Sequence, residues 1–235
     1  MGFGSKIERF VYIFIEKGAY REVLTGLKNT VVIAVLGLLI GIVIGTLIAA
    51  VRVAPKYSAF PRVLNKICDV YVAAFRGTPI VVQLLVFYYV FFPLLNARIT
   101  GMQVAILVFG LNSGAYISEI MRSGIQSVDP GQMEAGRSLG LNFVTTMRVI
   151  VIPQAVKNIL PTLGNEFIAL IKETSVISFV GAMDLYVAFN HIGTNSYEFM
   201  VPYSVMAIIY ILMVMLISFG IRLMERRLGR SDRRH

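Results

Sequence analysis

The sequence predicts an all-α membrane protein with about five transmembrane helices and a short cytoplasmic helix-turn-helix between the third and fourth spans. Of its 235 residues, 57% are hydrophobic and 15% are charged, whereas a soluble domain carries about 25% charged residues. Residues 31–51 and 201–221 contain no charge at all, and about 20 apolar residues suffice to cross a bilayer. The single cysteine, Cys68, excludes an intramolecular disulfide and a cysteine metal site.

Five apolar stretches define the expected spans, at 30–51, 66–85, 102–123, 155–177 and 202–224. The second is irregular because Arg76-Gly77-Thr78-Pro79 interrupts it. The region 66–95 is therefore either one long broken helix or a span followed by a re-entrant piece, and the boundaries within 66–101 stay open. We expect a transmembrane domain at 30–225, containing a cytoplasmic loop at 126–153.

The two ends of the chain are expected to lie outside the bilayer core. Residues 1–29 mix acidic and basic side chains and lack the apolar core of a signal peptide. They fit an amphipathic interfacial segment or, equally, an ordinary polar leader. Residues 226–235 form a basic tail.

Lys and Arg are distributed unevenly between the expected loops, and they favour the cytoplasmic side. They cluster after the first span, between spans three and four, and after the fifth span: Arg52, Lys56, Arg62, Lys66; Arg137, Arg148, Lys157; Arg222, Arg226, Arg227, Arg230, Arg233, Arg234. An odd number of spans then places the N-terminus outside and the C-terminus in the cytoplasm. The net charge of +9 lies beside spans rather than on a soluble face, which argues for a lipid bilayer and against nucleic acid as partner.

The first span carries small residues at every fourth position, Gly37, Gly41, Gly45 and Ala49. Residues at this spacing share one helix face, and small side chains let another helix approach closely. We expect packing within the subunit rather than a dimer interface.

The loop 126–153 carries helix-capping signals. Asp129 can cap a helix that starts with Pro130, and Gln132 can complete a capping box. Gly140 supplies a left-handed stop. Asn142 can then cap a second short helix, which we expect to end near the Ile152-Pro153 pair.

Four segments of the chain resemble a known family. Glu134-Ala135-Gly136, Gly140 and Ile152-Pro153 resemble the EAA loop of ABC-importer permeases, with Gly136 where a second alanine is usual. Three further segments resemble the polar amino-acid branch of that family (histidine-, arginine- and glutamine-type permeases): Phe75-Arg76-Gly77-Thr78-Pro79, Asn112-Ser113-Gly114-Ala115-Tyr116-Ile117-Ser118-Glu119 and Ile171-Lys172-Glu173-Thr174-Ser175.

The resemblance implies a subunit of a larger assembly in a bacterial-type inner membrane. In the family, the EAA loop is a coupling helix that docks on an ABC ATPase subunit, two permeases form the core, and an extracellular solute-binding protein delivers the solute. The second permease could be a copy of this chain or a paralogue. The residues implied to meet the ATPase are Glu134, Ala135, Gly136, Arg137, Ser138, Leu139 and Gly140.

The sequence lacks the signatures of several catalytic classes. No G-x-x-x-x-G-K-[ST] phosphate loop occurs, and neither His191 nor His235 has metal-ligand spacing. We expect no cofactor, no metal and no enzymatic activity on this chain, with ATP and magnesium bound by the partner ATPase.

Polar residues inside the expected spans are the candidate solute ligands, because a charge at mid-bilayer costs about 2.5–3.5 kcal/mol and usually faces a partner or a cavity. Glu166 lies midway along the fourth span beside Asn165, with no basic residue within four positions. Glu166 first and Glu119 second are favoured as ligands of arginine, histidine or lysine, with Asn165, Thr78 and Arg76 completing the site. Alternatively, Glu166 makes an interhelical hydrogen bond or ion pair, Glu119 pairs with Arg122, and Arg76 caps its own helix break.

Two other classes of protein remain alternatives. A secondary amino-acid carrier or channel would also have intramembrane charges and a broken span, but it would not need the capped loop. In a purely structural subunit, the same polar residues would serve packing alone.

Overall fold

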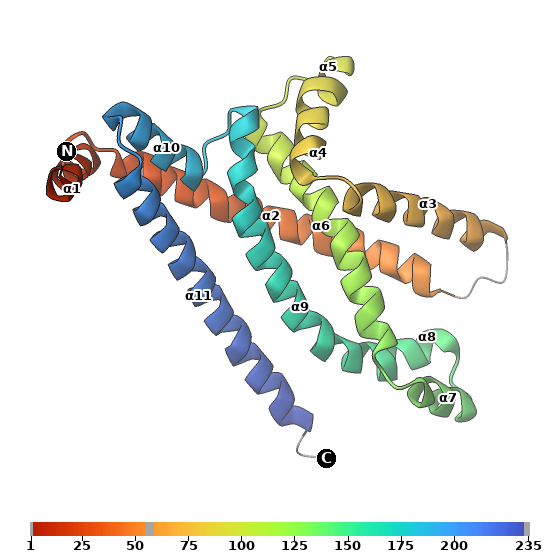
Figure 1. The fold of residues 1–235 in the computed structure, drawn as a ribbon. Coiled ribbons are helices and arrows are strands. Elements are labelled where there is room, and N and C mark those ends of the chain that lie inside the picture. Colours follow the sequence, from red (N-terminus) through yellow and green to blue (C-terminus); the bar gives the residue numbers. More distant parts are fainter. Residues whose placement is uncertain (1, 55–58, 233–235) are drawn as a thin grey trace.

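The structure, a computed structural model, describes residues 2–54 and 59–232, and within these ranges it contains helices and no strand. Residues 1, 55–58 and 233–235, which include Lys56, Arg233, Arg234 and His235 of the expectations above, lie outside the described residues. The elements (Figure 1) are α1 Phe3–Val11, η1 Tyr12–Glu16, α2 Tyr20–Val53, α3 Ala59–Arg76, α4 Ile80–Val86, η2 Phe87–Phe91, α5 Phe92–Leu94, α6 Gly101–Gln126, α7 Pro130–Ser138, α8 Phe143–Thr146, η3 Met147–Val151, α9 Ile152–Glu173, η4 Thr174–Val180, α10 Leu185–Ser196 and α11 Met200–Asp232.

The predicted spans correspond to long apolar helices. Four stretches are long and apolar enough to cross a membrane: Tyr20–Val53, Gly101–Gln126, Phe143–Val180 and Met200–Leu228. The pair α3 and α4 bends by 104° between Arg76 and Ile80, so it is a broken span or a re-entrant loop and raises the number to at most five. The interruption predicted at Arg76-Gly77-Thr78-Pro79 is therefore confirmed.

Helix α6 lies at the centre of the fold, packed against α2 on one side and α9 on another. The α2 face made of Gly37, Gly41, Gly45 and Ala49 is buried. A Cβ added to Gly45 would lie 2.7 Å from the Ile117 Cγ2 atom of α6. The two backbones thus approach too closely for any larger residue, and the expected packing within the subunit is confirmed.

The start of α2 differs from the expectation. The helix begins at Tyr20, about ten residues before the predicted span, and a Gly18 φ of +75° separates it from the leader. The polar first turns are held by tertiary contacts, because the Asn29 amide donates to the carbonyl of Met183 at 2.8 Å. Such contacts cannot be seen in the local hydropathy on which the prediction rested.

Two helical features near α9 were also not predicted. Helix α10 fills part of the segment that we expected to be a plain connection, and the Asp184 carboxylate caps it by accepting from the Val187 amide at 2.9 Å. The second short helix of the loop does not end at Pro153 but continues into the fourth span. A π-helical turn, η3, precedes Pro153 and accommodates the hydrogen bond that proline cannot donate.

The elements divide between two ends of the helix bundle. Figure 1 shows α1 and α10 near one end, and α7, α8 and the end of α11 near the other. The short helix α1 is tied to the start of α11 by an ion pair of 3.2 Å between Lys6 Nζ and Glu198 Oε1.

Candidate solute-binding and coupling sites

Glu166 lies on α9 where this helix packs against α6. The Ser113 hydroxyl on α6 donates to Glu166 Oε1 at 3.0 Å. Among the described residues, no ion pair involves Glu166. The structure therefore gives this partly buried carboxylate a neutral hydroxyl partner from another helix and no cationic one, while Asn165 beside it is exposed.

Arg76 ends α3 at the break, and its side chain contacts Tyr116 and Glu119 of α6. Its guanidinium lies over the Tyr116 ring, 5.4 Å from the centroid, and 3.8 Å from Glu119 Oε1. Tyr116 is three residues from Glu119, so these two side chains are neighbours on the surface of α6. Arg76 remains 44% exposed, which leaves part of its guanidinium available to a further anion.

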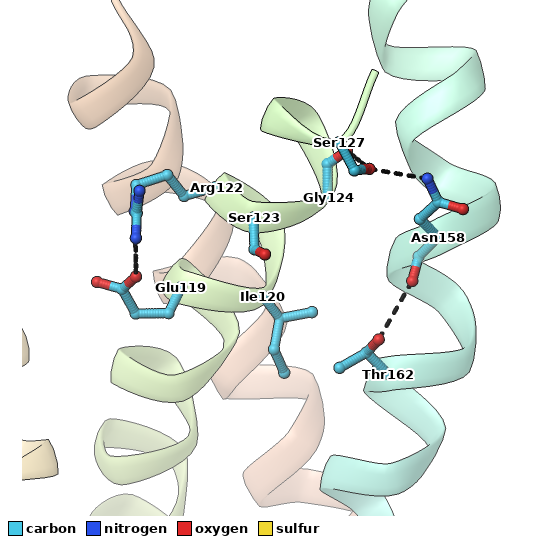
Figure 2. Close-up of a pocket in the computed structure, with 8 residues that line it drawn as sticks. All are labelled: Glu119, Ile120, Arg122, Ser123, Gly124, Ser127, Asn158 and Thr162. Atoms are coloured by element: carbon cyan, nitrogen blue, oxygen red, sulfur yellow. Dashed lines mark hydrogen bonds and ion pairs between the residues drawn. The ribbon is translucent and has the colours of Figure 1, made fainter. Parts of the chain in front are cut away.

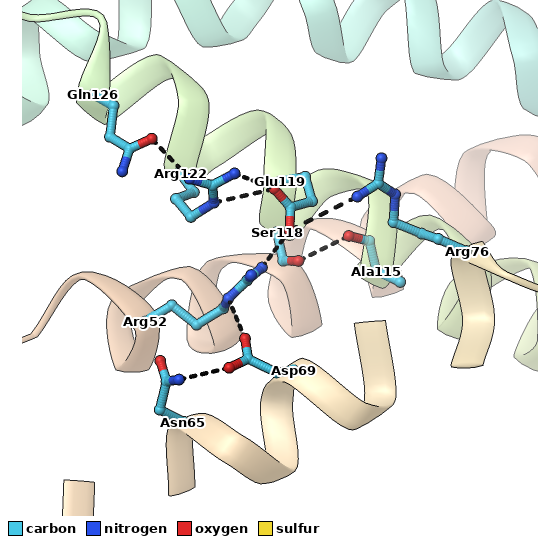
Figure 3. Close-up of polar contacts among 9 residues, drawn as sticks. All are labelled: Arg52, Asn65, Asp69, Arg76, Ala115, Ser118, Glu119, Arg122 and Gln126. Atoms are coloured by element: carbon cyan, nitrogen blue, oxygen red, sulfur yellow. Dashed lines mark hydrogen bonds and ion pairs between the residues drawn. The ribbon is translucent and has the colours of Figure 1, made fainter. Parts of the chain in front are cut away.

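Glu119 is the centre of an ion-pair network (Figure 3). Its Oε1 atom contacts Arg52 Nη1 at 2.5 Å, and its Oε2 atom contacts Arg122 Nη2 at 2.7 Å. Arg52 also pairs with Asp69 of α3 at 3.0 Å. The network thus joins α2, α3 and α6, and it includes the Glu119–Arg122 pair that we held as an alternative.

Thr78 takes part in a local hydrogen-bond network at the helix break. Its hydroxyl donates to the carbonyl of Ala74 at 2.7 Å and accepts from Gln83 Nε2 at 3.0 Å. The same Gln83 nitrogen also reaches the carbonyls of Phe75 and Thr78, at 2.8 and 3.0 Å. Gln83 therefore satisfies the carbonyl groups left free where α3 stops.

Sequence reasoning missed Arg52, Asp69 and Gln83. Arg52 and Glu119 are 67 positions apart in the chain, so no spacing rule connects them. Gln83 carried one available signal, because it is an amide in an otherwise apolar stretch just after a Gly-Thr-Pro break.

The loop after α6 forms a compact knob of two capped helices. The Asp129 carboxylate accepts from the Gly131 amide at 2.7 Å, and the Asn142 side chain accepts from the Thr145 amide at 2.8 Å. Gly140 has φ +84°, and the Leu141 amide donates to the Gly136 carbonyl at 3.1 Å, which is the hydrogen bond of a Schellman stop. The caps at Asp129 and Asn142 and the stop at Gly140 are confirmed.

The surface of this knob combines exposed and tightly packed residues. Leu139 is 81% exposed and Val144 is 71% exposed, although both lie on a polar loop. Gly136, in contrast, is buried, and a Cβ there would lie 2.5 Å from the Thr146 Cγ2 atom. The glycine at a position where the family pattern has alanine is therefore required by the close packing of α7 on α8.

No group of three or more His, Cys, Asp or Glu side chains in the described part of the chain is placed to hold a metal ion.

Comparisons with known proteins agree on one family. Residues 41–230 match the model of the binding-protein-dependent transport system inner membrane component. A putative glutamine transport system permease protein of Rickettsia bellii is 39% identical over 88% of this chain and 92% of its own length. An arginine transport system permease protein of Bacillus subtilis is 35% identical over 89% and 94%. A crystal structure described as an amino acid ABC transporter with histidines superposes with a TM-score of 0.83 at 37% identity, covering 92% of this chain and 98% of that one.

Proposed function

The chain belongs to the family of binding-protein-dependent transport system inner membrane components, and we propose that it carries basic amino acids such as arginine, histidine and lysine into the cell. It is an amino-acid permease of the ABC-importer type. In the proposal, it is the non-catalytic membrane subunit, and a separate ATPase drives its alternation between outward- and inward-facing states.

The lone carboxylate of Glu166 carries the preference for basic solutes. A buried charge without a counter-ion is costly, and a partner of opposite sign recovers part of that cost. Glu166 receives only the Ser113 hydroxyl. The cationic side chain of a bound amino acid would supply the missing partner at a point where the chain itself supplies none.

Arg76 is the proposed partner of the solute carboxylate. Guanidinium groups bind carboxylates in a fork geometry, and Arg76 is half-exposed above Tyr116. Both oxygens of Glu119 already contact arginines, so its role in the proposal is to orient Arg76 rather than to bind the cation. Thr78 shapes the adjacent break, and exposed Asn165 offers a further amide beside Glu166.

Uptake competition tests this assignment. In cells expressing the complete transporter, arginine is expected to compete with labelled arginine far better than glutamine or glutamate does. Glu166→Gln should lower the advantage of arginine about fivefold or more, whereas Glu22→Gln, the same change at an exposed glutamate of α2, should not. An unchanged preference in Glu166→Gln would remove the assignment.

The knob around α7 is the proposed docking element for the ATPase. An apolar side chain exposed as fully as Leu139 on a capped, rigid loop is typical of a protein contact. Glu134→Arg and Gly140→Leu are expected to abolish uptake and to weaken co-purification of the ATPase. Glu8→Arg, a charge reversal on α1, is the control. Normal ATP-coupled uptake by the loop variants would contradict the docking role.

The proposal also requires a second permease, either a copy or a paralogue, and a solute-binding protein outside. The most apolar stretch of α11 has no buried residue within this chain, and that of the α9 span is 22% buried. The span that carries Glu166 is therefore mostly uncovered by the rest of this chain. This supports a solute pathway that a second subunit completes.

The proposed orientation, with the N-terminus outside and the C-terminus in the cytoplasm of an inner membrane, has its own test. Cys68 is the single native cysteine, so a Cys68→Ser background allows labelling of introduced cysteines. A membrane-impermeant maleimide should label Ser5→Cys in intact cells and Arg226→Cys, at an exposed position near the end of α11, only after permeabilisation. The reverse pattern would invert the topology.

A further inference from the structure

A polar hollow lies between α6 and α9 on the half of the bundle nearer to α7, away from Glu166. Its volume is about 470 Å³, within the range of small-molecule sites. Figure 2 shows the side chains that line it: Glu119, Ile120, Arg122, Ser123, Gly124, Ser127, Asn158 and Thr162. Six of these eight residues carry polar side chains, and neither Glu166 nor Arg76 of the proposed solute site is among them.

The face of α9 that lines the hollow also carries Glu166, one turn beyond Thr162. Asn158, Thr162 and Glu166 are spaced by four residues and so lie on one face of the helix. At 1.5 Å per residue, they cover about 12 Å along the axis. A solute moving from Glu166 towards the α7 end would therefore pass along this face and reach the hollow next.

The α6 wall of the hollow carries the Arg122–Glu119 ion pair and Ser123, and the α9 wall carries Asn158 and Thr162 (Figure 2). The Arg122 guanidinium is held by Glu119 at 2.7 Å and by Gln126 Oε1 at 2.8 Å, and it is 35% exposed. The Ser123 hydroxyl, beside it on α6, has no hydrogen-bond partner among the described residues.

On the α9 wall, acceptor atoms remain available. Asn158 Nδ2 donates to Ser127 Oγ at 2.8 Å, which leaves the Asn158 side-chain oxygen as an acceptor. The Thr162 hydroxyl donates to the Asn158 carbonyl at 3.2 Å, and its oxygen can still accept. One wall can thus bind an anion and the other an ammonium group.

We infer that this hollow is a second binding site, which holds the α-carboxylate and α-ammonium groups of the amino acid after its side chain has left Glu166. The inference rests on the proposed function. Arg122 and Ser123 bind the carboxylate, while Asn158 and Thr162 accept from the ammonium group. These two groups are common to all α-amino acids, so the site recognises the class of solute, whereas Glu166 recognises the charge of the side chain.

Binding of L-alanine to the complete transporter tests the inference, because L-alanine presents the two groups with almost no side chain. The permease–ATPase complex is purified in detergent and titrated calorimetrically without nucleotide or binding protein. Wild type should bind L-alanine. Ser123→Ala and Thr162→Val should each weaken binding about fivefold, as expected for one hydrogen bond.

The matched control is Thr46→Val, the same isosteric change at a membrane threonine of α2 that lines a different, apolar hollow. The inference is overturned if wild type does not bind L-alanine, or if Ser123→Ala and Thr162→Val behave like Thr46→Val. If the proposed function is wrong, the uptake experiment shows it separately. Unlabelled arginine would then compete with labelled arginine no better than glutamine does in wild type.

Discussion

The two sides of α6 differ in what they place between helices. Towards α2, the contact consists mainly of glycines against aliphatic side chains: Gly45 faces Ile117, Gly110 faces Ile40, and Gly114 faces Ile44. Towards α9, the Ser113–Glu166 hydrogen bond crosses the contact, although Gly124 also packs on Ile159 there. Towards the α3 break, Arg52 of α2 joins α6 and α3 through Glu119 and Asp69.

The difference between the two sides of α6 indicates that one contact holds the fold together and the other serves transport. Glycine faces give close backbone contact, which is the main source of helix association in lipid. Polar contacts in a span contribute less to stability, and they lie where the second permease and the solute are proposed to pass. We therefore expect substitutions on the α2 side to disrupt folding and substitutions on the α9 side to alter transport.

The largest loss of stability is expected from a substitution in the α2 face of Gly37, Gly41, Gly45 and Ala49. In Gly45→Leu, the new side chain would overlap Ile117, so α2 and α6 must separate. We expect loss of the folded permease, measured as the yield of monodisperse protein after detergent extraction. Gly220→Leu is the control, because a Cβ at Gly220 meets nothing within 4 Å. Equal yields of the two variants would show that the glycine face is not a stability determinant.

A smaller loss of stability is expected at the centre of the ion-pair network. Glu119→Ala leaves Arg52 and Arg122 without their shared carboxylate, and Arg52 is only 15% exposed. Because these side chains are partly exposed, the variant should lose less stability than one that breaks a fully buried ion pair, about 1–3 kcal/mol. The thermal midpoint of the purified complex measures it. Glu22→Ala, which breaks an exposed pair with His191, should have almost no effect, and similar shifts for both would argue against the network.

The loop provides a second glycine contact of the α2 type. Gly136→Ala introduces a Cβ 2.5 Å from the Thr146 Cγ2 atom, and overpacking of this kind costs about 1–3 kcal/mol. We expect reduced uptake and weaker ATPase co-purification. Adding Thr146→Ser removes the methyl group and keeps the hydroxyl that donates to Asn142, so it should restore both. Failure of the double variant to recover would show that the glycine is needed for another reason.

A smaller, pH-dependent effect is expected at Asp184, a buried acid that, unlike Glu166, has a clear structural role. Burial raises the pKa of its carboxyl from 3.8 to about 6, although the amides of Val187 and Tyr186 oppose the shift. The folded chain then binds more protons than the unfolded chain between about pH 4 and pH 6, so stability falls as pH rises through this interval.

Asp184→Asn should remove this slope and raise the thermal midpoint at pH 7, since asparagine also caps helices well. Melting curves from pH 4 to pH 7 measure the effect, with Asp129→Asn as the matched change at an exposed cap. A slope that persists in Asp184→Asn would assign the pH dependence to another group.

Local signals in the sequence were sufficient to predict the span helices, the buried glycine face of α2 and the helix caps of the loop. These features depend on residues within a few turns of one another. The early start of α2, helix α10 and the continuation through Pro153 were missed, because tertiary contacts and a π-helical turn determine them. In the candidate site, Glu166 stood out by its isolation from basic neighbours. The network around Glu119 could not be recognised in the same way, because Arg52 and Asp69 lie on other helices, far from Glu119 in the sequence.

The most direct test of the account compares two isosteric solutes that differ in charge. L-arginine and L-citrulline are titrated into the purified permease–ATPase complex without the binding protein, for wild type and for Glu166→Gln. We predict that wild type binds arginine at least tenfold more tightly than citrulline, and that Glu166→Gln binds the two about equally. Equal affinities in wild type, or a preference that survives in Glu166→Gln, would contradict the role given to Glu166.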